Sequence, residues 1–251
     1  MTIEILNSKI DNLTMEETLA LIEKAIDSKT QIHHTVVNAS KIVAMQSDKE
    51  LRKSVNNSDL VNADGKAVVW ASKILGKPLK ERVTGIDLMN NIVTLADKKG
   101  LKIYFLGAED EVVRLVVKKY KEKYSNLVIA GFRNGFFQPS QEEDIAKEIS
   151  ASGAHVLFVA ISSPKKEIFL FNNKNLLANV NFIMGVGGSF DVVSGVTKRA
   201  PLWMQNSGLE WFYRLIQEPK RMWKRYLIGN TKFIHLVIKE KYFSLKTLKD
   251  S

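Results

Sequence analysis

The stretch LKIYFLGAEDEVVRLVVKKYKEKYSNLVIAGF, residues 101–132, decides the fold class. Its first part, 101–108, is an apolar segment typical of a buried strand, and 110–124 spaces valine, leucine and tyrosine as an amphipathic helix does. A second buried strand is predicted at 126–132. Two buried strands joined by a helix form a βαβ unit, in which the strands run parallel. This stretch therefore predicts an α/β fold.

The same alternation continues on both sides of this unit. We expect further strands at residues 32–39, 60–63, 154–161 and 180–188, and further helices at 40–58, 65–76, 85–100, 140–153 and 164–175. Ser140 is the expected N-cap of one helix, and Pro164 suits the first turn of another. Right-handed crossovers bring the carboxyl ends of such strands to one edge, where open sheets bind ligands. The prediction is a Rossmann-like, mostly parallel sheet flanked by helices.

The pattern changes near residue 196, where we place a boundary. Residues 1–195 form the predicted Rossmann-like core, and 196–251 form a basic helical appendage without strands. The segment 198–251 holds twelve Lys or Arg and four Asp or Glu, so its net charge of +8 supplies most of the +10 of the chain. Tryptophan and tyrosine lie between these basic residues. The combination suits an anionic bilayer surface, nucleic acid or substrate phosphates.

The composition argues against metal and disulfide chemistry. The chain has no cysteine, and its four histidines form no HExxH motif or Cys/His cluster. It has no Asp-x-Asp motif to clamp a metal–nucleotide complex, so no metal is expected. The first residues lack the basic and apolar regions of a signal peptide, and no segment offers about 18 uninterrupted apolar residues. We therefore expect a cytoplasmic protein without a spanning helix.

Asp64 is the first candidate for chemistry. It follows the apolar segment LVNA in LVNADGKAVVW, residues 60–70, where a strand passes into a helix. Aspartate is a favoured N-cap, and a strand end is also where open α/β sheets place catalytic groups. The two roles compete, because a carboxylate oxygen that caps a helix is not free to take a proton. Position alone leaves both a helix cap and a general base open.

Two further segments carry groups suited to phosphate. MGVGGSFD, residues 184–191, is a glycine-rich turn after a strand, and glycines let a backbone approach a phosphate or a base closely. It is neither a Walker loop nor GxGxxG, so a structural turn fits it equally well. ERVTGIDLM, residues 81–89, offers Arg82, whose planar fork matches phosphate oxygens. A solvated surface charge is the alternative for Arg82.

Together these motifs resemble one family over essentially the whole chain. VNADGKAVVWA, ERVTGIDLM, MGVGGSFDVVSGVTKRAP and GLEWFYRLIQEPKR have the order and approximate spacing found in the WecG/TagA/CpsF glycosyltransferases. The resemblance implies an inverting, metal-independent hexosyltransferase that takes N-acetylmannosamine, or its uronic acid, from a UDP-sugar. The implied acceptor is N-acetylglucosamine on undecaprenyl diphosphate. Products of the family enter wall teichoic acid, enterobacterial common antigen or capsule.

The resemblance also implies roles for individual residues. The family's catalytic aspartate, asparagine and arginine fall on Asp64, Asn38 and Arg82. The implied substrate contacts are Thr35, Gly65, Lys166, Arg214, Arg221 and Lys224, with Arg225 as the alternative to Lys224. The implied nucleotide site comprises Phe136, Gly187, Gly188, Ser189 and Asp191, and the ring of Phe136 stacks on uracil. Asp64 is then the general base, and the appendage completes the site at the inner face of the membrane.

Two positions depart from the family pattern. Val36 stands where the family often has threonine, with Thr35 beside it. Lys166, in the segment SSPKKE, stands where a substrate-binding glutamine is expected. A cation at this position favours an acidic donor sugar or a phosphate. The donor therefore stays open between N-acetylmannosamine and its uronic acid.

Two other functions fit parts of the sequence. A UDP-glucose-type hexosyltransferase of capsule or exopolysaccharide assembly would use the same core. A basic nucleic-acid-binding protein would use the tail through stacking and phosphate contacts, although the family resemblance makes a nucleic-acid partner unexpected. The expected partners are a UDP-sugar donor, a lipid-diphosphate-linked acceptor and an anionic membrane surface. A homo-oligomer is compatible with the sequence, which does not set the oligomeric state.

Overall fold

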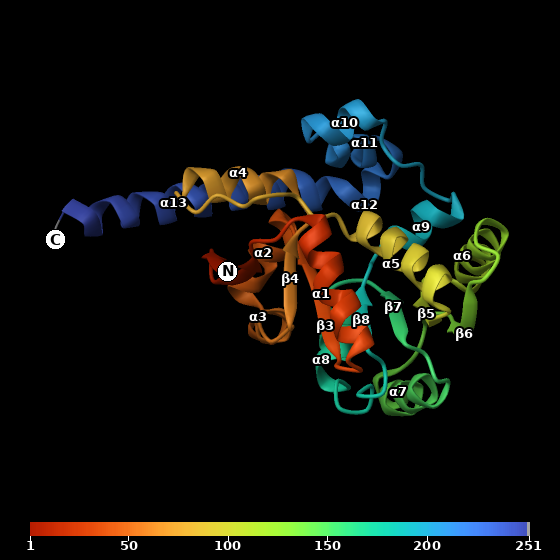
Figure 1. Ribbon diagram of the computed structural model, residues 1–251. Helices are drawn as coiled ribbons and strands as arrows, with labels where there is room; N and C mark the ends of the chain where they lie inside the picture. Colours follow the sequence, from red (N-terminus) through yellow and green to blue (C-terminus); the bar gives the residue numbers. More distant parts are fainter. Residues whose placement is uncertain (250–251) are drawn as a thin grey trace.

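A wholly parallel sheet of six strands forms the centre of the molecule, in the order β4-β3-β8-β7-β5-β6 (Figure 1). The computed structural model describes residues 1–249, and for Arg221 and 244–249 it describes the backbone alone. The strands are β3 (Ile32–Val37), β4 (Leu60–Ala63), β5 (Lys102–Gly107), β6 (Val128–Arg133), β7 (Val156–Ala160) and β8 (Phe182–Gly185). Each overlaps a strand expected from the sequence, and the α/β prediction is confirmed.

Helices cover both faces of this sheet. One face carries α1 (Met15–Asp27), α5 (Gly85–Lys99), α6 (Asp110–Lys123) and α9 (Ser189–Ser194), which pack on the apolar cluster around Phe105 and Phe158. The other face carries α2 (Ala39–Ser47), α3 (Lys49–Asn56), α7 (Glu142–Ala151) and α8 (Lys165–Asn172). Apolar side chains on both faces of every buried strand explain why these strands read as continuous apolar runs.

The neighbouring strands β3 and β8 mark the point at which ligands are expected. The chain leaves β3 for α2 on one face, and it leaves β8 for α9 on the other. When adjacent parallel strands feed helices on opposite faces, a crevice opens at their carboxyl ends. Asn38 follows β3, and the glycine loop 186–188 follows β8, so both segments flank this crevice.

Several local features differ from the sequence predictions, among them α1, which was not foreseen. The helix expected at 40–58 is two helices, because Asp48 ends α2 and accepts a hydrogen bond from the Leu51 amide to cap α3. Ser140 is not an N-cap, because a 3-10 turn over Pro139–Gln141 precedes α7. An N-terminal hairpin, β1 (Thr2–Ile5) and β2 (Ser8–Asp11), was not foreseen. Its turn residues Leu6 and Asn7 both have positive φ but lack the Asn-Gly signature of such turns.

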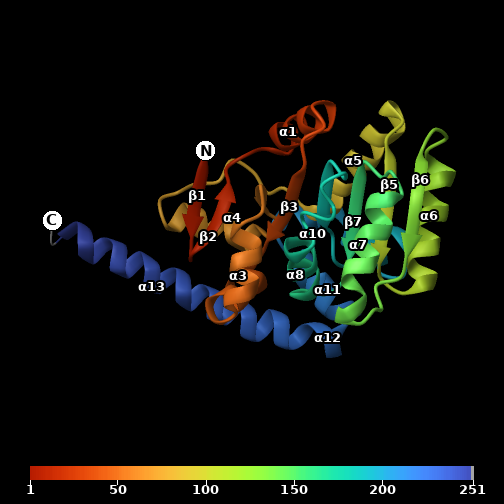
Figure 2. The same ribbon diagram turned by 90° about the horizontal axis from the view of Figure 1, so that it is seen from below.

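The chain after α9 is helical, as expected. It forms α10 (Leu202–Ser207), α11 (Glu210–Gln217), α12 (Pro219–Trp223), the π-helical turn η2 (Lys224–Ile228) and α13 (Gly229–Lys249). In Figure 1, α10 and α11 stand above the main body, and α13 runs beside α4 (Lys66–Ile74) and projects past it. Figure 2 shows the same projection from below.

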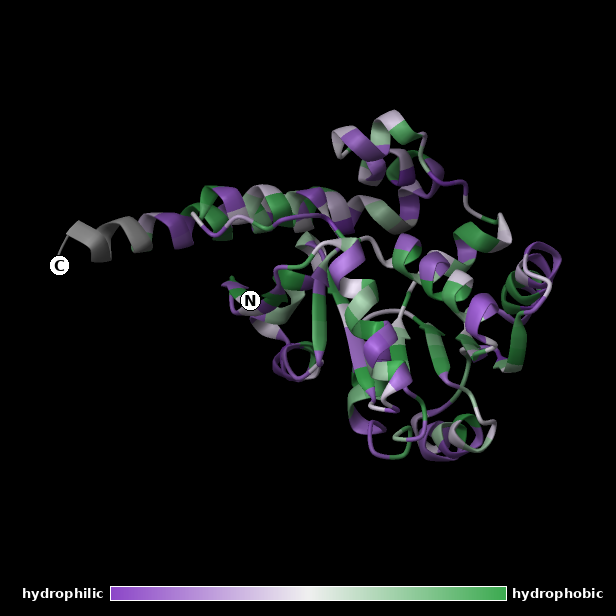
Figure 3. Cartoon of the chain, viewed as in Figure 1, coloured by the Kyte–Doolittle hydropathy of each residue, from purple (hydrophilic) through white to green (hydrophobic). Residues whose placement is uncertain are grey.

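The appendage is fastened to the core by α13. Phe233 and Val237 of α13 are buried in the cluster formed by the hairpin, α2 and α4. Apolar and polar residues alternate along the coloured part of α13 in Figure 3. No helix within residues 1–249 combines the length and apolar character that a bilayer crossing requires. The division of the chain into two domains at residue 196 stays a prediction.

Candidate active site

Asp64 lies at the carboxyl end of β4, and its side chain does not cap α4, the helix that follows it. The N-cap of α4 is Gly65, and no side chain caps that end. The Asp64 amide donates to the Val37 carbonyl at 2.9 Å, which holds the residue beside the end of β3. Its Oδ1 accepts one long hydrogen bond, 3.3 Å from the Gly85 amide at the start of α5. Asp64 as the cap of α4, one of the two roles that its position left open, is therefore wrong.

Charged groups from the core and the appendage surround this carboxylate. Arg82 donates from Nη1 to Oε2 of Glu210 at 3.1 Å, so α11 is tied to the loop before α5. Arg199 binds Asp87 through two hydrogen bonds of 2.6 and 2.7 Å, and its Nε lies 3.9 Å from Glu210. Burial and the negative charge of Glu210 raise the pKa of Asp64, against the opposing effect of Arg82. A carboxyl with a raised pKa at a strand end suits a general base.

Asn38 and Gly65 lie together next to Asp64. Asn38 is the N-cap of α2, and its Oδ1 accepts from the Lys41 amide at 3.0 Å. A Cβ built on Gly65 would stand 3.4 Å from the Cβ of Asn38, so the two segments are in contact. The cap uses the amide oxygen of Asn38 and leaves its nitrogen as the group that can donate to a substrate.

The glycine loop after β8 receives an arginine from the appendage. The Arg214 guanidinium lies so close to Gly188 that a Cβ at that position would collide with it. Gly187 has a φ of +52°, a left-handed conformation that favours glycine. Ser189 donates from Oγ to the Val186 carbonyl at 2.9 Å, which shapes the turn, and Asp191 lies in the first turn of α9. Loop amides and a guanidinium thus meet at one place, an arrangement that suits a diphosphate.

Lys166 lies in a buried ion cluster rather than on an open surface. Oε1 of Glu167 lies 2.6 Å from the Lys166 Nζ and 2.7 Å from the Lys41 Nζ, and all three side chains are almost fully buried. Lys41 also donates to the Val36 carbonyl at 2.6 Å. Burial and the repulsion of Lys41 lower the pKa of Lys166 to about 8. Although burial alone would raise it, the two lysines hold the pKa of Glu167 down to about 2.

The comparisons with known proteins settle the family. A model of the glycosyl transferase WecG/TagA/CpsF family matches residues 3–247. The chain belongs to this family. It is therefore a glycosyltransferase, and the resemblance seen in the sequence motifs is confirmed.

Two Bacillus relatives of this glycosyltransferase carry the same name, N-acetylglucosaminyldiphosphoundecaprenol N-acetyl-beta-D-mannosaminyltransferase. The protein of Bacillus subtilis strain 168 is 36% identical over 215 residues, which cover 86% of this chain and 82% of the relative. The protein of Bacillus spizizenii is 35% identical over 192 residues, which cover 76% of this chain and 73% of the relative.

Several expected site residues of the glycosyltransferase lie less directly at the crevice. Thr35 is buried, and its hydroxyl lies 3.4 Å from the Lys41 Nζ, so it supports the ion cluster. Phe136 follows β6, and its exposed ring lies in a loop that Gly135 packs against the ends of β5 and β7. Lys224 is exposed, with its Nζ 5.5 Å from the centre of the Trp223 ring. The side chain of Arg221 lies outside the described residues.

The structure adds residues to the site that the sequence did not single out. They are Glu210 and Arg199 from the appendage side, and Lys41 and Glu167 from the core. Lys41 carried one signal, because it stands three residues after Asn38 and its amide completes the cap. No spacing in the sequence links Glu210 to Arg82, which precedes it by 128 positions.

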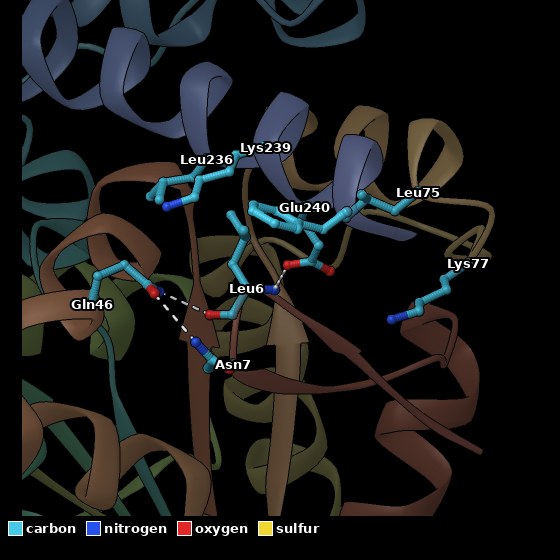
Figure 4. Close-up of a pocket in the computed structure, with 9 residues that line it drawn as sticks. Leu6, Asn7, Gln46, Leu75, Lys77, Leu236, Lys239 and Glu240 are labelled. Carbon is cyan, nitrogen blue, oxygen red and sulfur yellow. Dashed lines mark hydrogen bonds between the residues drawn. The ribbon is translucent and has the colours of Figure 1, made fainter. Parts of the chain in front are cut away.

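An open pocket of the glycosyltransferase lies away from the strand ends. It is bounded by the hairpin turn at Leu6 and Asn7, by Gln46, and by Leu236 and Glu240 of α13 (Figure 4). Beside this pocket the Leu6 amide donates a hydrogen bond to Oε2 of Glu240 at 3.0 Å, which ties the hairpin turn to α13. This pocket shows how α13 is seated on the hairpin and contributes no group to the surroundings of Asp64.

Proposed function

We propose that this glycosyltransferase moves N-acetylmannosamine from UDP to N-acetylglucosamine on a lipid diphosphate, with inversion at the anomeric carbon. The name of both relatives supports this donor sugar, this acceptor and a β-linkage. The observation that carries the mechanism is the Asp64 carboxylate, which lies at a strand end without an ion-pair partner in the described chain and has a raised pKa.

Asp64 accepts the proton of the acceptor hydroxyl while the oxygen of that hydroxyl forms a bond to the anomeric carbon. The bond from that carbon to the phosphate oxygen breaks on the opposite face, and UDP leaves with the electron pair. Arg82 and Arg214 stabilise the negative charge that develops on the diphosphate, which is the largest electrostatic demand of the reaction. The Asn38 amide orients the sugar, and the loop of Gly187, Gly188 and Ser189 receives the nucleotide with Asp191.

The transfer needs no metal ion in this proposal. Within residues 1–249 no group of three or more His, Asp or Glu side chains is placed to hold one. The two arginines supply the positive charge that a divalent ion would supply in other transferases. We expect the turnover rate to be the same in EDTA and in magnesium, and a rate restored only by magnesium would contradict this.

The appendage binds the inner face of the cell membrane in this proposal. Its exposed apolar residues are Val196, Leu202, Trp203, Leu209, Phe212, Ile216, Trp223, Leu227, Ile228, Ile234, Ile238, Tyr242 and Phe243. Basic residues between them attract anionic lipid by about 1 kcal/mol each. The protein should sediment with phosphatidylglycerol vesicles and stay in the supernatant with phosphatidylcholine vesicles, and added salt should release it.

A panel of UDP-sugars tests the donor. Transfer to a lipid-diphosphate-GlcNAc analogue is measured by product mass with UDP-N-acetylmannosamine, its uronic acid, UDP-N-acetylglucosamine and UDP-glucose. Lys166 is almost fully buried and its ammonium is paired with Glu167, so it is not held open for a sugar carboxylate, which favours the neutral N-acetylmannosamine. We expect this donor to give the highest kcat/KM. A preference for the uronic acid would show that Lys166 reads a carboxylate, and a preference for UDP-glucose would overturn the proposal.

A further inference from the structure

Arg82 binds one carboxylate and acts electrostatically on a second, and the two come from different parts of the chain. Glu210, the first residue of α11, accepts the hydrogen bond from Arg82 Nη1, and both side chains are largely buried at 17% and 33% exposure. Asp64 is close enough to both for each to act on its protonation, with Glu210 opposed to Arg82. Arg82 is thus the cation for which the two carboxylates compete.

The contact is part of a line of alternating charges that crosses from the core to the appendage. Asp87 on α5 holds Arg199, whose Nε faces Glu210, and Glu210 in turn holds Arg82 beside Asp64. Arg199 belongs to the segment that leads into α10, and Glu210 begins α11. The position of the Glu210 carboxylate is therefore set by how the appendage is seated on α5.

We propose that Glu210 is a positioning residue, which holds Arg82 away from Asp64 when α11 is seated and so leaves the Asp64 carboxylate free to take the acceptor proton. The proposal rests on the role of Asp64 as general base in the function proposed above. One donor of the guanidinium binds Glu210, and a guanidinium has five, so Arg82 can still reach a diphosphate. The packing of the appendage on the core then also makes the Asp64 carboxylate available to accept the proton.

Removal of the Glu210 charge would change the partner of Arg82. We expect the released guanidinium to approach Asp64, on which its charge already acts, and a nearer arginine lowers the pKa of an aspartate. The other charged or titratable groups that face Asp64 are Lys41 from α2, Arg199 from the segment before α10 and Tyr226 from η2. Of these groups Arg199 also faces Glu210, and its two hydrogen bonds to Asp87 hold it in place when the Glu210 charge is removed.

The test is the pH profile of kcat for the full-length Glu210→Gln protein. Glutamine keeps the size of the side chain and removes its charge. We expect the acidic limb to move to lower pH, and kcat on the plateau to fall roughly three- to tenfold because a weaker base accepts the proton. Glu210→Asp keeps the charge and should retain more of the rate. Glu240→Gln is the matched control, since Glu240 is an appendage glutamate that accepts a hydrogen bond from the Leu6 amide, in the pocket away from the strand ends.

The outcomes separate this inference from the role of Asp64. An unmoved limb with full kcat in Glu210→Gln overturns the inference, and so does an equal shift in Glu240→Gln. If Glu210→Gln unfolds, Glu210→Ala takes its place as the variant without the charge, and an acidic limb identical to that of the parent protein, with full kcat, overturns the inference instead. If Asp64→Asn keeps the full rate, Asp64 is not the base and the proposed function fails with it. If Asp64→Asn loses its rate while Glu210→Gln is unaffected, only the role of Glu210 is refuted.

Discussion

Two carboxylates at the same edge of the sheet have opposite chemistry. Glu167, which follows β7, is held by two lysine ammonium groups at 2.6 and 2.7 Å, and its pKa falls to about 2. Asp64, which follows β4, accepts one backbone hydrogen bond of 3.3 Å, and its pKa rises. Burial raises the pKa of each, so the partners account for the difference. A carboxylate with two ammonium partners is suited to a structural role, and one without them is suited to the role of a base.

Replacement of the base gives the largest expected effect. Asp64→Asn keeps the shape of the side chain but cannot take a proton, so kcat should fall about 10²- to 10⁴-fold. Unfolding in urea should show nearly unchanged stability, because no ion pair is lost within the described chain. An Asp64→Asn protein with the turnover of the parent would mean that another group is the base.

Replacement of the structural ion should act on stability instead. Glu167→Gln leaves two buried lysines without their counter-ion, and breaking a buried pair costs about 3–5 kcal/mol of unfolding free energy. Because the folded pKa of Glu167 lies below its ordinary value of 4.5, its contribution is complete above that pH and is lost as pH falls toward about 2. Urea unfolding from pH 7 to pH 3 measures both effects. A stable Glu167→Gln protein with no turnover would reverse the roles of the two carboxylates.

A substitution in the glycine loop can displace the Arg214 guanidinium without changing Asp64. Gly188 has a φ of −75°, which alanine adopts freely, but its new methyl group would displace the Arg214 guanidinium. Loss of a charge-assisted hydrogen bond is worth about 1.5–3 kcal/mol, so UDP should bind roughly 10- to 100-fold more weakly. Calorimetric titration measures this. If Gly188→Ala acts through Arg214, adding it to Arg214→Ala should weaken binding no further.

Replacement of Lys166 gives the smallest expected effect, and it tests one of the two ammonium groups that distinguish Glu167 from Asp64. Its pKa of about 8 means that the ammonium loses its proton as pH rises through that value. If its charge supports substrate binding, kcat/KM should decline severalfold above pH 8, and this limb should be absent in Lys166→Gln. An identical alkaline limb in the two proteins would limit Lys166 to holding Glu167.

The sequence predicted the sheet well because each strand is a continuous apolar run between clear helices. The position of Asp64 after an apolar strand made it a candidate, whereas Asn38 and the role of Arg82 came from the resemblance to the family, and the roles of these three residues stay predictions. The sequence did not predict Glu210 against Arg82, because that contact depends on how the appendage packs on α5. It did not foresee the partner of Lys166 either, since neighbouring residues on a helix do not ordinarily face each other. Glu167 meets Lys166 where both approach Lys41 of α2.

The pH dependence of kcat/KM, measured for the parent protein and for Asp64→Asn, tests the central claim most directly. The parent protein should lose activity as pH falls through a limb that lies above the ordinary range of an aspartate, because the raised pKa of Asp64 sets it. The residual activity of Asp64→Asn should be flat over the same range. The same acidic limb in both proteins would show that the proton of the acceptor goes to a group other than Asp64.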